Sequence, residues 1–203
     1  MASLLLWPGA GSDRTQSTLV AVDEAVGRAS PGVTTVRADF PYRKRPGRRP
    51  PDREPVLLQA IRDEIAVLPP GPIVLGGRSM GGRMCSILAA GPTKGLFHPA
   101  SVAGVVMISY PLHPPGKLDR LRVEHFPRLH LPCLFIHGTR DAFGTPDELS
   151  RWTATIPGPV DHVWIERGTH ELRGADAQVA DAVVAWTRQE RIFTRKRAAR
   201  PRG

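Results

Sequence analysis

The chain is poor in cysteine, and its two cysteines do not form a pair with a known function. Cys85 and Cys133 lie in separate apolar segments, without the spacing of zinc sites, redox motifs or disulfide frameworks. We therefore interpret both as reduced core residues of a cytoplasmic protein.

Long apolar runs and metal-ligand patterns are also missing. No segment approaches the roughly 20 consecutive apolar residues of a membrane-spanning helix, so we expect no membrane partner. The segment Met1–Pro8 has no basic region, and its apolar run is shorter than the core of a signal peptide. Because the histidines show no ligand spacing with acids or cysteines, we expect no metal.

Acidic residues are the minority, with 19 Asp and Glu against 28 Lys and Arg, but the positive excess is confined to two segments. Residues 37–53 hold seven basic and two acidic side chains, and residues 188–203 hold seven and one. Both segments have almost none of the aromatic residues on which bases stack, so we do not expect nucleic-acid binding. We predict one domain over residues 1–190 and a basic, disordered tail over residues 191–203.

The pattern of apolar segments predicts an α/β fold. Short apolar runs alternate with longer stretches of helical period, as in βα units around a parallel sheet. The stretch Tyr110–Leu131 is too short for a large cap domain, so a site at the carboxyl ends of the strands should be open. The predicted strands are Ser3–Trp7, Thr34–Asp39, Ile73–Gly76, Gly104–Ser109, Cys133–His137 and His162–Glu166, and the predicted helices are Thr15–Ala29, Glu54–Leu68, Met80–Gly91, Pro146–Ile156 and Asp176–Arg188.

The most informative motif is Gly77–Gly81, which reads G-R-S-M-G and matches the G-x-S-x-G nucleophile elbow. An apolar run, Pro72–Gly76, precedes it, and a helical segment follows it, in the order that this turn requires. The flanking glycines allow backbone segments to approach closely around a strained serine. Ser79 is therefore the candidate nucleophile.

A serine hydroxyl is a weak nucleophile and needs a base that a carboxylate orients. Asp141 follows one predicted strand, and His170 follows the next. Taken alone, Asp141 fits a turn or a helix N-cap, and His170 fits an ordinary surface histidine. The order nucleophile, acid, base along the chain is that of the α/β-hydrolases, and parallel strands end at one sheet edge. We therefore predict a catalytic triad of Ser79, Asp141 and His170.

The oxyanion of acyl transfer needs preorganised backbone donors. Met80, directly after the nucleophile, should supply one. In the loop Pro8–Ser12 after the first predicted strand, Ala10 is the best candidate for the second, with Gly11 as the alternative. The same loop could cradle a phosphate, but neither a complete G-x-G-x-x-G nor the Lys-Ser/Thr of a P-loop is present. We therefore expect no nucleotide and no other cofactor.

Further residues near these motifs are weaker candidates for substrate binding. Gly11 and His113 are placed where they could line a substrate pocket, although His113 fits a surface position equally well. Arg78 and Arg83 flank the nucleophile and suit either an anionic substrate group or a local carbonyl or acid. His137 should shape the loop that holds the acid.

In four short segments the chain resembles the α/β-hydrolase superfamily, and the match spans residues 3 to about 188. It resembles in particular the small dienelactone-hydrolase-like members, and among them the group containing testis-expressed protein thirty and subunit three of the non-specific-lethal chromatin complex. The resemblance implies a minimal fold of about six mostly parallel strands flanked by helices, without a large cap domain and without the first two antiparallel strands of the family. The matching pieces are Pro8–Gly11, Gly77–Gly81, His137–Asp141 and Gly168–His170.

The resemblance also implies hydrolysis through an acyl-enzyme. Dienelactone hydrolases have a cysteine nucleophile where this chain has Ser79, so their substrate is not carried over. We expect a serine hydrolase whose partner is a small-molecule ester or thioester. The alternative is a non-catalytic module that keeps the scaffold and uses its basic loop and tail to bind a partner or nucleic acid. The sequence leaves the oligomeric state and the substrate open.

Overall fold

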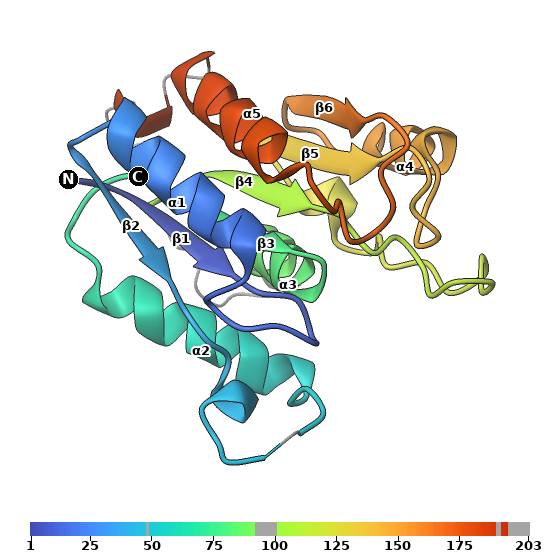
Figure 1. Ribbon diagram of the computed structural model, residues 1–203, viewed down its shortest axis with the longest axis horizontal. Coiled ribbons are helices and arrows are strands. Elements are labelled where there is room, and N and C mark those ends of the chain that lie inside the picture. The colour runs from blue at the N-terminus through green and yellow to red at the C-terminus, as the bar shows by residue number, and fades with distance from the viewer. Residues whose placement is uncertain (48, 92–100, 190–191, 195–203) are drawn as a thin grey trace, which may run out of the picture.

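The computed structural model describes residues 1–47, 49–91, 101–189 and 192–194, and its centre is a six-stranded sheet (Figure 1). The strands lie in the order β2-β1-β3-β4-β5-β6, and every neighbouring pair is parallel. The predicted sheet of about six strands is confirmed, and the described strands are parallel throughout. The bounds are β1 (Ala2–Trp7), β2 (Val33–Arg37), β3 (Ile73–Arg78), β4 (Val102–Ile108), β5 (Cys133–Gly138) and β6 (Val160–Ile165).

Helices follow the strands along the chain, as the alternating pattern predicts. Among the residues that the structure describes, no helix is long and apolar enough to cross a membrane. The α-helices are α1 (Ser17–Ala29), α2 (Glu54–Val67), α3 (Met80–Ala89), α4 (Pro146–Thr153) and α5 (Asp176–Gln189), and the short 3-10 helices are η1 (Pro41–Arg43), η2 (Phe126–Arg128) and η3 (Ile192–Thr194).

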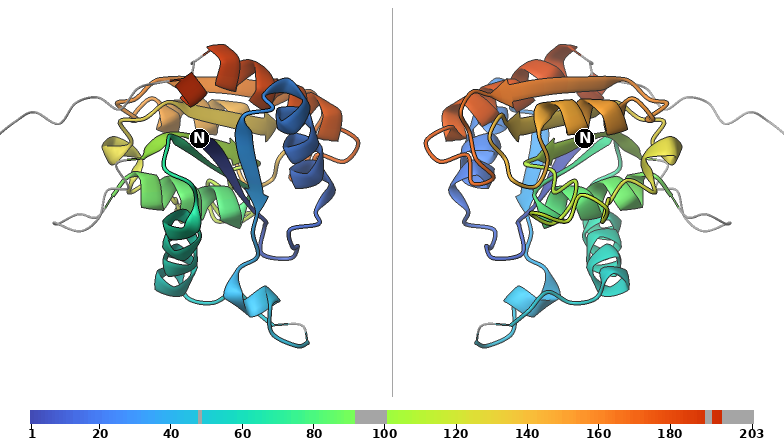
Figure 2. Two further views of the ribbon diagram at one scale, coloured as in Figure 1. Left: turned by 90° about the vertical axis from the view of Figure 1, so that its left-hand side faces the viewer. Right: turned by 90° about the vertical axis from the view of Figure 1, so that its right-hand side faces the viewer.

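Both faces of the sheet are covered, which explains why the central strands are continuous apolar runs instead of alternating ones. Helices α1 and α5 cover one face, where Leu19 and Val183 share a core with Leu4 of β1 (Figure 2). Helices α2 and α3 cover the other face, and Ile61 and Met84 belong to the core cluster there. Because the two helix layers cover the faces of the sheet, the loops after the strands lie at the carboxyl edge of the sheet.

Some elements end a few residues from their predicted bounds. Strand β2 ends at Arg37 and not at Asp39. Beyond its end, the Asp39 carboxylate accepts a hydrogen bond of 2.7 Å from the Arg14 amide in the loop after β1. Helix α4 ends at Thr153 and not at Ile156. At that end the Thr155 hydroxyl donates a 2.7 Å hydrogen bond to the carbonyl of the preceding turn.

Within the described ranges, no connection between the strands forms a cap domain. The stretch between β4 and β5 contains η2, and its Tyr110, Leu112 and Phe126 are fully buried, so it closes the core. The predicted tail, residues 191–203, lies outside the described residues except for 192–194. These three residues form η3, where Ile192 is buried in the core that α5 covers.

Candidate active site

Ser79 occupies a sharp turn between β3 and α3, in a backbone conformation that is strained for a residue with a side chain. Its φ is 49° and its ψ is −116°, outside the helical and extended regions. A Cβ on Gly77 would lie 2.6 Å from the Trp7 carbonyl oxygen, and one on Gly81 would lie closer still, so both positions need glycine. A hydrogen bond of 2.8 Å from the Ser79 amide to the Ile108 carbonyl oxygen holds the turn.

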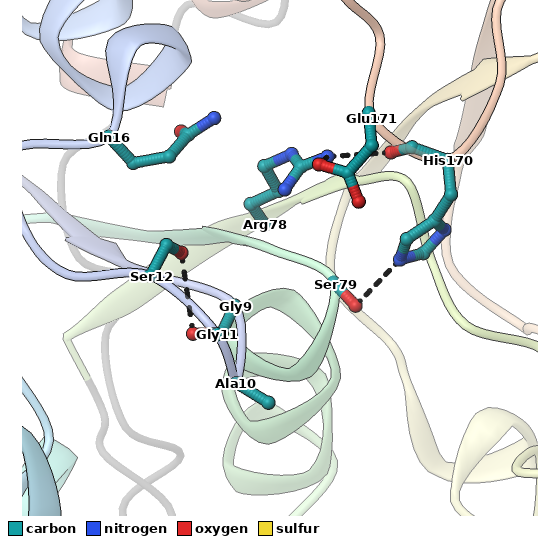
Figure 3. Close-up of a pocket in the computed structure, with 9 residues that line it drawn as sticks. All are labelled: Gly9, Ala10, Gly11, Ser12, Gln16, Arg78, Ser79, His170 and Glu171. Atoms are coloured by element: carbon teal, nitrogen blue, oxygen red, sulfur yellow. Dashed lines mark hydrogen bonds and ion pairs between the residues drawn. The ribbon is translucent and has the colours of Figure 1, made fainter. Parts of the chain in front are cut away.

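The structure brings the side chains of Ser79, His170 and Asp141 together at the carboxyl ends of β3, β6 and β5. Ser79 Oγ lies 2.9 Å from His170 Nε2 (Figure 3). On the other side of the ring, His170 Nδ1 lies 2.8 Å from Asp141 Oδ2. The Asp141 carboxylate is fully buried. Because an ionised carboxylate only accepts hydrogen bonds, Nδ1 carries the proton, and Nε2 is left to accept the proton of the serine hydroxyl. This arrangement is suited to nucleophilic attack by the serine.

The loop that carries Asp141 is fixed from two sides. Asp141 Oδ1 accepts a hydrogen bond of 2.8 Å from the Phe143 amide, and the Phe143 ring packs on the His170 ring with 4.1 Å between the centroids. His137 Nε2 donates to the Gly144 carbonyl oxygen at 2.8 Å and lies 3.5 Å from Asp141 Oδ2. Burial lowers the pKa of His137, which therefore shapes this loop as a neutral group.

Arg78 links the nucleophile elbow to the loop that carries the base. Its Nη2 donates to the His170 carbonyl oxygen at 2.7 Å and to Glu171 Oε2 at 3.0 Å. The Arg78 side chain is only 6% exposed, so its positive charge is satisfied by these contacts within the protein. Arg83, the other arginine beside the elbow, pairs with Glu54 at 3.1 Å. From the sequence alone, either arginine could satisfy a local carbonyl or acid. No pattern in the sequence, however, predicted that Arg78 contacts His170.

The loop after β1 lies beside Ser79 and presents candidate oxyanion donors. Within the described part of the chain, the N–H group of Ala10 in this loop and that of Met80 at the start of α3 donate no backbone hydrogen bond. The loop is held by a turn in which the Ser12 amide donates to Gly9 at 3.2 Å, and by Tyr42, whose hydroxyl donates to the Ala10 carbonyl oxygen at 2.9 Å. This role of Tyr42, which is buried in the structure, was not predicted from the sequence. The only signal in the sequence is an aromatic residue directly before a run of basic ones.

These groups surround an open cavity of about 350 Å³. Figure 3 shows the Ser79 hydroxyl directed at the His170 ring on one side and the loop with Ala10 on the other. Gly11, the alternative donor, also lines the cavity, and a Cβ placed there would meet nothing within 4 Å. The complete lining consists of Gly9, Ala10, Gly11, Ser12, Gln16, Arg78, Ser79, His170 and Glu171.

His113 does not join this lining. Its ring is 3% exposed, and its Nδ1 lies 3.0 Å from the Pro114 carbonyl oxygen. Its Nε2 lies 3.6 Å from Glu148 Oε1 at the start of α4. The structure therefore places His113 beside α4 and the loop that carries Asp141, outside the lining of the cavity at Ser79.

The two cysteines are buried and unpaired. Burial raises the pKa of the Cys133 thiol to about 12 and raises that of Cys85 as well, so both thiols stay protonated. Cys85 lies on α3 beyond the elbow, where its Sγ donates to the Gly76 carbonyl oxygen at 3.4 Å. Over residues 1–47, 49–91, 101–189 and 192–194, no group of three His, Cys, Asp or Glu side chains is arranged to hold a metal ion.

Comparison with known proteins relates the chain to one family. The sequence model of a family described as alpha/beta hydrolase domain matches residues 1–192. The match therefore includes the loop after β1, the serine turn and the loops that carry Asp141 and His170.

Solved structures share the architecture at low sequence identity. Est1E from Butyrivibrio proteoclasticus superposes with a TM-score of 0.72 at 16% identity, over 93% of this chain and 87% of that one. An alpha-beta serine hydrolase homologue from Coxiella burnetii gives 0.70 at 16%, over 91% and 84%. A dienelactone hydrolase from Anabaena variabilis gives 0.70 at 21%, over 93% and 86%. Identities of this size show a shared fold and leave the chemistry to the residues themselves.

Proposed function

The chain belongs to the alpha/beta hydrolase domain family, and from this membership and its site we propose that it is a serine hydrolase that cleaves a small ester or thioester. The observation that carries the proposal is the pair of hydrogen bonds that join Ser79 Oγ to His170 Nε2 and His170 Nδ1 to Asp141 Oδ2. The strained backbone of Ser79 supports it, because strain of this kind is typical of functional positions.

The proposed reaction passes through an acyl-enzyme. Ser79 Oγ attacks the substrate carbonyl carbon while His170 Nε2 takes the hydroxyl proton, and Asp141 stabilises the resulting imidazolium. The N–H groups of Ala10 and Met80 donate to the oxyanion of the tetrahedral intermediate. His170 then returns the proton to the departing alcohol or thiol. In the second half, His170 deprotonates a water that attacks the acyl carbon and releases Ser79.

Covalent labelling tests the nucleophile and its orienting acid. A fluorophosphonate probe should label the protein at Ser79, and Asp141→Asn should slow labelling by about 10²- to 10⁴-fold, because the base then loses its tautomer and its charge partner. Mass spectrometry of the labelled peptide locates the site, and the time course of labelling gives the rate.

A matched serine serves as the control. Ser150→Ala removes an exposed serine on α4 and should label at the native rate, whereas Ser79→Ala should not label. Undiminished labelling of the Ser79→Ala variant would show that another residue is the nucleophile.

Three finer assignments accompany this proposal. We assign the chain to the dienelactone-hydrolase-like group that contains testis-expressed protein thirty and subunit three of the non-specific-lethal complex, on the motifs quoted above. We place it in the cytoplasm, since its two cysteines are reduced and buried. We treat residues 1–190 as the hydrolase domain, with a small molecule as its substrate.

A further inference from the structure

A second hollow adjoins the candidate active site. It has a volume of about 450 Å³ and is lined by Ala10, Gly11, Arg43, Arg49, Pro50 and Pro51. Ala10 and Gly11 also line the cavity of Ser79, so the loop after β1 forms the wall between the two spaces. The other side of the hollow comes from η1 and the residues after it, which project from the body of the molecule in Figures 1 and 2.

The basic loop that lines this hollow has a cation without an acidic partner. Among the described residues of 37–53, four basic side chains lie within 4.0 Å of a carboxylate, whereas Arg49 and Arg53 do not, and of these two only Arg49 lines the hollow. Arg49 is exposed, and its Nε donates to the Pro46 carbonyl oxygen at 3.2 Å. That bond uses Nε and leaves the two terminal nitrogens of the guanidinium for a ligand.

Arg43 adds a second positive group to the same hollow. Its Nη2 lies 3.6 Å from Asp13 Oδ2, which is longer than a charge-assisted hydrogen bond, so its donors are not fully used there. Pro50 and Pro51 restrict the backbone beside Arg49, which reduces the entropy lost when a ligand binds. Two arginines beside one hollow suit a group with two negative charges and several acceptor oxygens.

Phosphate has that chemistry. A phosphate monoester carries close to two negative charges at neutral pH and three acceptor oxygens, and the arginine fork matches its geometry. We propose that the hollow around Arg49 and Arg43 binds a phosphate group on the leaving group of the ester or thioester. The substrate then lies across Ala10 and Gly11, with its carbonyl at Ser79 and its phosphate at Arg49. This inference rests on the proposed function.

Pairs of thioesters that differ by one phosphate test the inference. The acetyl thioesters of 2-mercaptoethanol and pantetheine are compared with those of their phosphorylated counterparts, which carry the phosphate at a short and at a long distance from the carbonyl. At one of these lengths kcat/KM should be at least about tenfold higher for the phosphorylated thioester. Arg49→Gln should reduce that ratio to about one, and added salt should reduce it in the native protein.

Arg120→Gln is the matched control, because it removes the same charge from an exposed arginine in the segment after β4, which Figure 1 shows well away from η1. This variant should keep the native ratio. Equal kcat/KM for the phosphorylated and neutral members of both pairs would overturn the inference. So would a ratio that survives in Arg49→Gln.

A binding measurement separates this inference from the proposed function. Calorimetry with the free phosphorylated thiols needs no turnover, and their affinity should fall at least about tenfold in Arg49→Gln. If no thioester is cleaved but this binding is observed, only the hydrolase proposal fails. If neutral thioesters are cleaved and no phosphorylated thiol binds, only the phosphate site fails. Binding of a single-stranded RNA that is tighter than that of either thiol, and that Arg49→Gln removes, would also overturn the phosphate site.

Discussion

Arg78 connects two parts of the candidate site that are 92 positions apart in the sequence, and it does so through the backbone of the base. The guanidinium holds the His170 carbonyl oxygen, while the imidazole of the same residue reaches Ser79 and Asp141. The orientation of the base therefore depends on a side chain that need not touch the reacting atoms. Arg78 is a positioning residue in this interpretation.

Replacing Arg78 with Gln should slow catalysis more than it weakens substrate binding. The loop of His170 loses its anchor, and a small displacement of a base is costly in rate, so we expect kcat to fall about tenfold with a smaller change in KM. Steady-state kinetics on a neutral ester measure both constants. Arg83→Gln, which breaks only the pair with Glu54, should leave both within about twofold. A raised KM with unchanged kcat would instead indicate that Arg78 contacts the substrate.

The types of residue at the site could be predicted from the sequence, but their supports could not. The sequence shows a serine between glycines, followed by an acid and a histidine after later strands. This pattern can be recognised from the sequence alone. The hydrogen bond from Tyr42 to Ala10 and the packing of Phe143 on His170 depend on how loops fold back. Such contacts have no spacing rule, because any polar or aromatic side chain in the loop could provide them.

At the scale of single elements, α4 begins with a capping box directly after the loop that holds Asp141. The Glu148 amide donates to Thr145 Oγ1 at 3.3 Å, and Glu148 Oε2 accepts from the Thr145 amide at 2.8 Å. Hydrogen bonds from the Thr145 backbone and hydroxyl lower the pKa of Glu148. The helix start thus fixes the end of the acid loop.

Thr145→Ala should destabilise the protein by about 1 kcal/mol, since the first turn of α4 loses its side-chain acceptor. For a chain of this length the melting temperature should fall by about 2–4 °C. Calorimetry or circular dichroism measures this shift. Ser150→Ala changes a hydroxyl on the same helix outside the cap and should move the melting temperature by less than about 1 °C. Equal shifts for both variants would mean that the cap contributes nothing.

The existence of each strand and each α-helix was predictable, whereas the ends of some of them and the short 3-10 helices were not. Short continuous apolar runs rich in β-branched residues, such as that of β4, are typical of a strand covered on both faces. Where an element ends depends on contacts with other segments, as after β2, where the Asp39 carboxylate accepts a hydrogen bond from the Arg14 amide in the loop after β1. The position of the basic loop beside the loop after β1 likewise follows from tertiary packing alone.

At the scale of the whole molecule, the strand order explains why the site lies where it does. From β1 the chain moves outward to β2 and then returns to form β3 on the other side of β1. The loops that follow β1 and β3 therefore leave the sheet side by side, and a crevice opens between them. Ala10 lies on the first of these loops and Ser79 on the second. Sequence patterns predict βα units, but they do not state the order in which the strands pair.

The stability of the molecule should fall as the pH decreases from about 7.5 to 5.5. Burial lowers the pKa of His125 to about 3, so this histidine stays neutral in the folded protein, and burial also lowers the pKa of His162. In the unfolded chain a histidine takes up a proton near pH 6.5, so acid favours unfolding.

His125 alone should contribute up to about 1.4 kcal/mol per pH unit to the free energy of unfolding in this range, measured by urea unfolding. His125→Gln should flatten the dependence, and His130→Gln, at an exposed position, should preserve it. A free energy of unfolding that stays constant between these pH values would show that His125 is protonated in the fold.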